Sequence, residues 1–284
     1  MIRQALILAS SLVLSAGVFA QAPKIDFPGA SPTATLKQRI GLTDVEITYS
    51  RPSLKGRAML GHINPYGQVW RVGANDATRI VFSRPVKLNG TDVPAGTYGL
   101  FAIPDVSEWT IILSSASKQW GAYKYDPKDD VVRFKAKAST FSKPIETFTI
   151  DYTDYSVGKA TLNMLWEKTR VTMDIEDDSV ATVAAQIDAV MASDGKKPYI
   201  PAAQFYYDSN LDPKKALAWV DAAIAEKPAT YSVDTLRAKL LAKAGEKDAA
   251  IAQAKEAIEL AKKGVEPARS EYIRLNEDII ARLQ

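Results

Sequence analysis

The sequence contains no cysteine and a single histidine, His62, in 284 residues. Without cysteine it has neither a disulfide framework nor a lipid-bearing cysteine. A zinc centre usually takes about three or four Cys, His or carboxylate ligands, so we expect no metal and no cofactor. A Ser-His-Asp arrangement would need His62 as its base, and no G-x-S-x-G motif accompanies it. A lone histidine in a glycine-rich loop is more typical of a hydrogen-bonding surface residue.

A large charge of either sign is also lacking. The chain has 36 Lys and Arg against 33 Asp and Glu, for a formal net charge of +3. Nucleic-acid-binding proteins normally show a large basic excess or stripe, so no nucleic-acid partner is expected. The hydrophobic fraction of 46% and the charged fraction of 24% are typical of a folded soluble protein. Its length predicts one or two domains.

Only one long apolar run is present, and it lies at the N-terminus. Arg3 precedes the run Ala5–Phe19, and Val18 and Ala20 occupy the −3 and −1 positions of a cleavage site before Gln21. The run is shorter than the ~20 residues that span a membrane. Residues 1–20 are therefore predicted to be a cleaved signal peptide rather than an anchor. The mature protein is expected in the periplasm or outside the cell, with no integral membrane segment.

After a linker at residues 21–33, residues 34–176 have the pattern of an all-β domain. Apolar and polar residues alternate in Val45–Tyr49 and Thr78–Phe82, and Asn89-Gly90 is a strong hairpin signal. Short strands separated by turns favour a sandwich or an open barrel. The other predicted strands are Val86–Leu88, Tyr98–Ile103, Trp109–Leu113, Val131–Phe134, Thr147–Tyr152, Ala160–Trp166 and Arg170–Ile175.

Residues 177–284 have a helical pattern and form a second predicted domain. Asp212-Pro213 is a helix cap followed by proline at the first helical position. Gly195, Gly245 and Gly264 fall where helix ends favour a left-handed residue. The predicted helices are Ser179–Ser193, Pro198–Ser209, Pro213–Lys227, Tyr231–Ala244, Lys247–Lys263 and Pro267–Leu283.

Two of these helices share a spacing of small residues. One set repeats after 34 residues, the period of a tetratricopeptide repeat, whose two helices touch closely. The sets are Ala216, Val220, Ala223 and Pro228, followed by Ala250, Ala254 and Ala257. Because the usual Trp, Leu and Gly of the first helix are absent, an unrelated α-hairpin bundle remains the alternative. Helical repeats would offer the C-terminal part a surface for contact with a protein partner.

The stretch Tyr49–Arg84 concentrates positive charge. It holds six basic residues against a single acid, Asp76. Prolines and glycines interrupt every periodic pattern between Arg51 and Gln68, which indicates a long loop. Its apolar side chains, such as Leu54 and Met59, favour an ordered loop because they give it surface to bury. One interpretation is structural, with arginines that bridge loop carbonyls. The other is a site for a small anionic or carboxylate ligand or a peptide, formed by Arg51, Arg57, His62, Tyr66, Trp70, Arg71, Asn75 and Trp120.

Two further clusters of side chains could form sites. Asp126, Asp129 and Asp130 offer oxygen ligands for Ca²⁺ but lack the D-x-D-x-D-G spacing, so Asp126 is interpreted as a turn cap. The second cluster, which could stack on a sugar or a peptide, consists of Trp109, Trp120, Tyr123 and Tyr125. Trp109 lies within a predicted strand and is expected in the core. Trp120 lies outside a clean strand and is expected to be either exposed or partly buried.

Several motifs of the β-region resemble one family. They include Tyr49–Ser53, Lys55–Arg57, Pro65–Asn75, Pro94–Gly99, Gln119–Tyr123 and Tyr125-Asp126. The chain from Ser31 to Ile175 resembles domain-of-unknown-function family two-nine-one-one of exported bacterial proteins. The resemblance implies an extracytoplasmic β-domain that is sometimes followed by helical repeats. It implies no catalytic residues, because the family has no established activity.

The sequence therefore predicts an exported two-part protein of the cell envelope. A binding or assembly role is favoured, because a binding module needs only a cleft of matching charge. An enzyme would also need a perturbed acid or base near a nucleophile, and the sequence shows none. The alternative is an extracytoplasmic hydrolase or lyase that uses the same basic loop.

Overall fold

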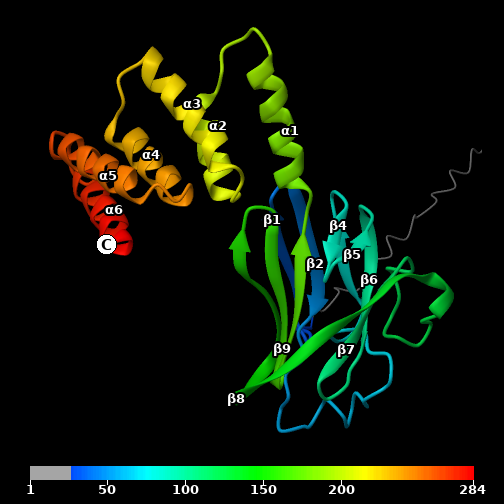
Figure 1. Cartoon of the computed structure of the whole chain (residues 1–284). Coiled ribbons are helices and arrows are strands. Elements are labelled where there is room, and N and C mark those ends of the chain that lie inside the picture. Colours follow the sequence, from blue (N-terminus) through cyan, green and yellow to red (C-terminus); the bar gives the residue numbers. More distant parts are fainter. Residues whose placement is uncertain (1–26) are drawn as a thin grey trace, which may run out of the picture. The chain divides into compact units, whose positions relative to one another are not determined.

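The computed structural model describes residues 27–284 (Figure 1). The predicted signal peptide and residues 21–26 of the predicted linker lie outside the described residues. The described chain is a β-domain followed by helices, which confirms the predicted fold class. No helix in residues 27–284 is long and apolar enough to cross a membrane.

The β-domain is one antiparallel sheet of nine strands among the described residues. Its order is β1-β2-β3-β6-β7-β8-β9-β4-β5. The strands are β1 (Thr33–Ile40), β2 (Thr43–Ser50), β3 (Thr78–Phe82), β4 (Val86–Leu88), β5 (Thr91–Val93), β6 (Gly96–Ile103), β7 (Glu108–Ser114), β8 (Asp130–Ser156) and β9 (Lys159–Glu176). Alternation sets the buried face of the strands, as the burial pattern of β2 shows.

The sheet curls so that β2 contacts β8 across the core. The Tyr49 hydroxyl accepts a hydrogen bond from the Ile150 amide at 3.0 Å, and its ring meets Phe148 edge-on at 5.7 Å. Such curling removes the apolar faces of both strands from water. The predicted hairpin is also present, because Asn89 and Gly90 both have positive φ and join β4 to β5.

Strands β8 and β9 are longer than predicted. Each was expected as two short strands, but β8 runs through 27 residues and β9 through 18. Register shifts between Thr140 and Ile145 and between Ile145 and Thr149 absorb the residues that break the alternation. The interruption in the sequence pattern is therefore a set of bulges within one strand rather than a turn.

Trp70 fills the centre of the β-domain core. It is 5% exposed and stacks on Trp166 at 5.6 Å, while Trp109 and Phe148 approach it edge-on at 5.8 and 5.3 Å. Its indole N–H donates to the Gly73 carbonyl at 3.2 Å, which satisfies the one polar group of the ring. Trp109 is 2% exposed, so its predicted core position is confirmed.

The helices match the prediction to within about two residues. They are α1 (Ser179–Ala192), α2 (Tyr199–Asp208), α3 (Pro213–Glu226), α4 (Tyr231–Lys243), α5 (Lys247–Lys262) and α6 (Ala268–Leu283). The Asp212 carboxylate accepts from the Lys214 amide at 2.9 Å and caps α3 as expected. Gly245 adopts the left-handed conformation after α4, with φ of 82°.

The same prediction was wrong for two other glycines. Gly195 and Gly264 are not among the residues of positive φ. Helix α1 ends at Ala192 and Ser193 has extended backbone, so the chain has already left the helix before Gly195. After α5, Lys263 keeps helical backbone and the Gly264 amide donates to the Ala261 carbonyl at 2.8 Å. Neither end requires a left-handed residue.

The helices bury their own apolar cluster, which shares no residue with the β-domain core. Small residues allow close contact between helices. Among those of the predicted 34-residue spacing, Ala216, Val220, Ala250, Ala254 and Ala257 are fully buried. Any larger side chain at these positions would have to displace a neighbouring helix.

Asp177 ties the end of β9 to the turn between β1 and β2. Its carboxylate accepts from the Leu42 amide at 2.9 Å, the Thr43 hydroxyl at 3.1 Å and the Ser179 amide at 3.0 Å. Gly41 in this turn has φ of +56°, and a Cβ there would lie 2.2 Å from the Ser179 hydroxyl oxygen. The turn therefore requires glycine, for both conformation and space.

Candidate functional site

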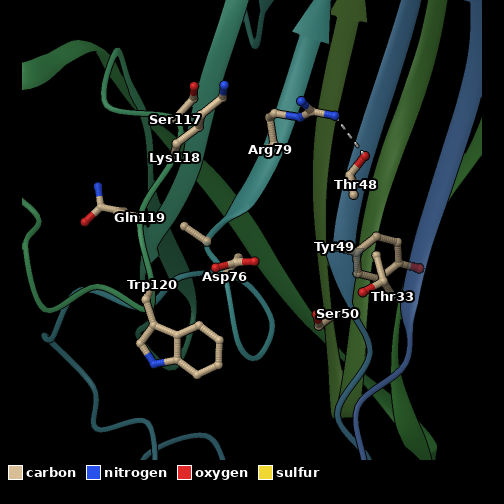
Figure 2. A pocket seen from close by; sticks show the side chains of 11 residues that line it. Thr33, Thr48, Tyr49, Ser50, Asp76, Arg79, Ser117, Lys118, Gln119 and Trp120 are labelled. Atoms are coloured by element: carbon tan, nitrogen blue, oxygen red, sulfur yellow. Dashed lines mark hydrogen bonds between the residues drawn. The ribbon is translucent and has the colours of Figure 1, made fainter. Parts of the chain in front are cut away.

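An open cavity of about 460 Å³ lies on the β-domain (Figure 2). Its walls come from β1, β2, the start of β3 and the first part of the loop that follows β7. The side chains that bear on its chemistry are Arg79 on β3, Asp76 just before it, and Lys118, Gln119 and Trp120 on the loop. The cavity therefore combines charge of both signs with an aromatic ring.

Backbone pairing places Trp120 beside Asp76. The Ala77 amide donates to the Gln119 carbonyl at 3.0 Å, and the Gly121 amide donates to the Asn75 carbonyl at 3.0 Å. These bonds flank an isolated antiparallel bridge between Asp76 and Trp120. In such a non-hydrogen-bonded pair the two side chains project from the same face and lie close together. Backbone hydrogen bonds therefore hold the Asp76 carboxylate and the Trp120 indole side by side.

Three side chains of the cavity, Trp120, Asp76 and Lys118, are exposed and accessible to a ligand. Trp120 is 60% exposed, although it is one of the largest apolar side chains in the protein. Within residues 27–284, neither the Asp76 carboxylate nor the Lys118 ammonium has an ion-pair partner, and both residues are exposed. Figure 2 shows the Asp76 carboxylate above the edge of the Trp120 ring.

Arg79 is held only loosely. Its Nη2 lies 3.5 Å from both the Glu46 carboxylate and the Thr48 hydroxyl, at the limit of hydrogen bonding. Glu46 has a closer partner, since Lys37 Nζ lies 2.8 Å from its carboxylate. The hydrogen bond from Lys37, more than the charge of Arg79, holds the pKa of Glu46 below its usual value. The remaining guanidinium donors of Arg79 are therefore available to an anion.

Two buried polar atoms lie in and beside the loop. Gln119 Oε1 is buried without a hydrogen-bond partner, while its Nε2 donates to the Ala116 carbonyl at 3.1 Å. Arg71 Nε is also buried and unpartnered. A Cβ on Gly121 would lie 2.8 Å from Arg71 Nη1. Arg71 therefore packs against the loop that carries Trp120 and does not line the cavity.

The two arginines of the basic loop bond mainly to backbone carbonyls. Arg51 donates to the Phe148 carbonyl at 3.1 Å and to the Thr149 hydroxyl at 2.8 Å. Arg57 donates to the Leu54 carbonyl at 2.9 Å and the Ser53 carbonyl at 2.8 Å. These bonds match the structural interpretation of the stretch, in which arginines fix an irregular loop.

The remaining predicted site residues are dispersed. His62 and Tyr66 are exposed, Trp70 is in the core, and the Asn75 amide lies 3.4 Å from the Ser50 hydroxyl. Of the eight predicted residues, only Trp120 lines the cavity. The Ca²⁺ alternative is not needed for Asp126, since its carboxylate caps a 3₁₀ turn by accepting from the Lys128 amide at 3.0 Å.

Sequence reasoning missed four residues of the cavity. Asp76 and Arg79 were noted only as charges of the basic stretch, Gln119 only as part of a family motif, and Lys118 not at all. One signal was available for Asp76, because it is the sole acid among six basic residues. No sequence signal pairs residues 75–77 with residues 119–121, because that pairing depends on how two loops meet in the folded sheet.

Comparison with known proteins adds one finding. A family model described as a protein of unknown function (DUF2911) matches residues 31–175, which is just over half of the chain. Comparisons with curated proteins and with solved structures gave no significant match. The helices lie outside the matched residues, so their tetratricopeptide-like character stays a prediction. The chain belongs to the DUF2911 family of proteins of unknown function.

Proposed function

We propose that the β-domain is a binding module and that the cavity beside Trp120 takes a small ligand bearing a carboxylate. The observation that carries the proposal is the exposed indole of Trp120, held at a cavity that also contains unpaired charges. A volume of about 460 Å³ lies within the range of small-molecule sites. A ligand that covers the Trp120 ring would remove a large apolar surface from water, and this burial would contribute to affinity.

The polar groups suit a ligand with both acceptor and donor atoms. Lys118 and the free donors of Arg79 would bind the carboxylate, with charge-assisted hydrogen bonds. Asp76 would accept from a hydroxyl or amine of the ligand, and Gln119 Oε1 offers a second acceptor. Trp120 would cover the apolar face of the ligand. The proposed ligand is anionic, as expected from the sequence. Its proposed site is the cavity and not the loop that contains Arg51 and Arg57.

The ligand proposal is tested by thermal unfolding with a panel of amino acids, short peptides and acidic sugars. We expect at least one carboxylate-bearing compound to raise the melting temperature, because ligand at about a hundred times its Kd stabilises by about 2.7 kcal/mol. Trp120→Ala and Lys118→Ala should each remove that rise. Added salt should reduce the ligand-induced rise, because Lys118 and Asp76 are exposed and salt screens their charges.

Two control variants separate this site from its surroundings. Tyr123 is 80% exposed in the same loop but does not line the cavity, so Tyr123→Ala should keep the ligand-induced rise. Arg51→Ala should lower the melting temperature of the free protein and leave the rise intact, because Arg51 bonds the loop. A rise that survives Trp120→Ala but disappears in Arg51→Ala would return the site to the basic loop and refute this proposal.

We further propose that the protein is exported and acts in the cell envelope, on the strength of Arg3, the apolar run and Ala20. The mature chain is expected to begin at or near Gln21. Intact-mass measurement of protein recovered from the periplasm or the medium tests the cleavage. A mass that still includes Met1 would contradict it.

A further inference from the structure

A second depression, of about 340 Å³, lies among the helices and is far more acidic than the β-domain cavity. Helices α3, α4 and α5 supply its charged and polar side chains: Asp221, Asp234, Arg237, Gln253 and Glu256. Three carboxylates against one guanidinium give the depression a formal charge of −2. Ile224 and Ala229 add apolar surface to the wall.

The one cation of the depression is already bound. Arg237 Nε donates to the Asp221 carboxylate at 2.9 Å, and its Nη1 donates to Gln253 Oε1. Gln253 Nε2 in turn lies 3.2 Å from the Glu256 carboxylate. This chain of bonds runs from α3 through α4 to α5 and engages the Nε and Nη1 donors of Arg237 and the Nε2 donor of Gln253. No bond in it reaches Asp234.

Asp234 is the unexplained group. It is 5% exposed, it lines the depression, and no side chain in the described part of the protein pairs with its carboxylate. Burial, followed by the charge of Glu256, raises the pKa of Asp234, whereas Arg237 lowers it. A nearly buried carboxylate without a partner destabilises the folded state. Asp234 lines the depression, and the two recorded hydrogen bonds of Arg237, the cation there, go to other residues, so we infer that the partner of Asp234 comes from outside.

We propose that this depression binds an organic ammonium group, supplied by a lysine side chain of a partner protein. The ammonium would donate to Asp234 and approach Glu256, while the lysine stem would lie against Ile224 and Ala229. An organic cation fits better than a metal ion, because no group of three or more His, Asp or Glu in residues 27–284 is arranged to hold one. A free diamine also carries an organic ammonium group, and the experiment below distinguishes it from a lysine side chain.

The test uses the full chain and a peptide of glycine and serine with one central lysine. Binding is followed by NMR through the side-chain carboxyl signal of Asp234, whose titration should move to lower pH when the peptide is bound. Asp234→Asn should weaken binding about tenfold or more, since it removes the charge that faces the ammonium. Asp248→Asn is the matched control: it removes one exposed carboxylate from α5 outside the depression and should leave Kd within about twofold, a small effect expected of a screened charge.

Three results would overturn the proposal. The first is an unchanged Kd in Asp234→Asn, and the second is equal binding of the same peptide with acetyl-lysine, which carries no charge. The third is binding of 1,5-diaminopentane as tight as that of the peptide, which would assign the site to free diamines instead of a partner protein. None of these outcomes depends on the β-domain cavity, so failure here leaves the carboxylate proposal untouched.

Asp234→Asn has a second readout that does not need a ligand. Because the folded-state pKa of Asp234 is raised, the ionised carboxylate destabilises the fold at neutral pH, and the variant should melt at a higher temperature than the wild type. The difference should shrink as the pH falls through the raised pKa and the wild-type side chain takes up its proton. Asp221, Arg237 and Glu256 face this group and are unchanged in both proteins. A variant that melts lower at neutral pH would show that Asp234 has an internal partner, which contradicts the proposal.

Discussion

Replacing Trp70 by alanine is expected to lower the free energy of unfolding of the β-domain by about 3–5 kcal/mol. The side chain is 5% exposed, and three other large aromatic rings pack against it. Its removal leaves a cavity between Trp166, Trp109 and Phe148, which lie on three different strands. It also deprives the Gly73 carbonyl of its donor. Urea denaturation followed by far-UV circular dichroism measures the loss.

Trp120→Ala is the control for this experiment, since it deletes the same side chain from a position that is 60% exposed. We expect it to change the free energy of unfolding by no more than about 0.5 kcal/mol. The contrast between the two tryptophans tests the assignment of one to the core and the other to the cavity. Equal losses in both variants, or a stable Trp70→Ala protein, would show that the aromatic cluster is not the centre of the core.

The second large effect is expected in the helices. Ala254 is fully buried on α5, where α4 and α6 both pack. Ala254→Leu inserts three carbon atoms into this contact, and overpacking of a dense interior costs about 1–3 kcal/mol. Because the apolar cluster of the helices shares no residue with the β-domain core, the loss should appear in the helical unfolding transition alone.

Ala252→Leu provides the matched control, because Ala252 lies two residues away on the same helix and is exposed. It adds the same atoms on the solvent side and should leave stability nearly unchanged. Differential scanning calorimetry compares the transitions of the two variants with that of the wild type. If Ala254→Leu is tolerated as well as Ala252→Leu, the close helix contact inferred from the small-residue spacing is wrong.

The helical part of the fold could be predicted closely because its signals are local. Asp212-Pro213 starts α3 by capping and by the fixed φ of proline, and Gly245 ends α4 in the left-handed region. Neither signal needs information from distant residues. Gly195 and Gly264 show the limit of this reasoning, since a helix can also end in extended or helical backbone without a left-handed residue.

The strands and the cavity were harder to predict because they depend on residues far apart in the chain. In β8 and β9, polar residues that resemble turns lie within continuous strands, where shifts in the β8–β9 register accommodate them. These shifts depend on the pairing of the two strands, which the local sequence does not show. The cavity arises where the Asp76 segment meets the Trp120 segment, a pairing of residues 44 positions apart. The bonds of Arg51 and Arg57 likewise go to nearby carbonyls and to β8, so their count alone could not distinguish a loop brace from an anion site.

The placement of the tryptophans also makes the protein its own optical reporter. Trp70 and Trp166 stack with an interplanar angle of 13° inside an apolar core, so their emission should be blue-shifted and their transitions coupled in near-ultraviolet dichroism. Trp120 is exposed and should emit toward the red, at the position where a ligand would cover it. A change in red-edge emission that is absent from Trp120→Ala should therefore report occupancy of the cavity, since Trp219 on α3 is only partly buried and also contributes. The dichroism of the stack should report the integrity of the core.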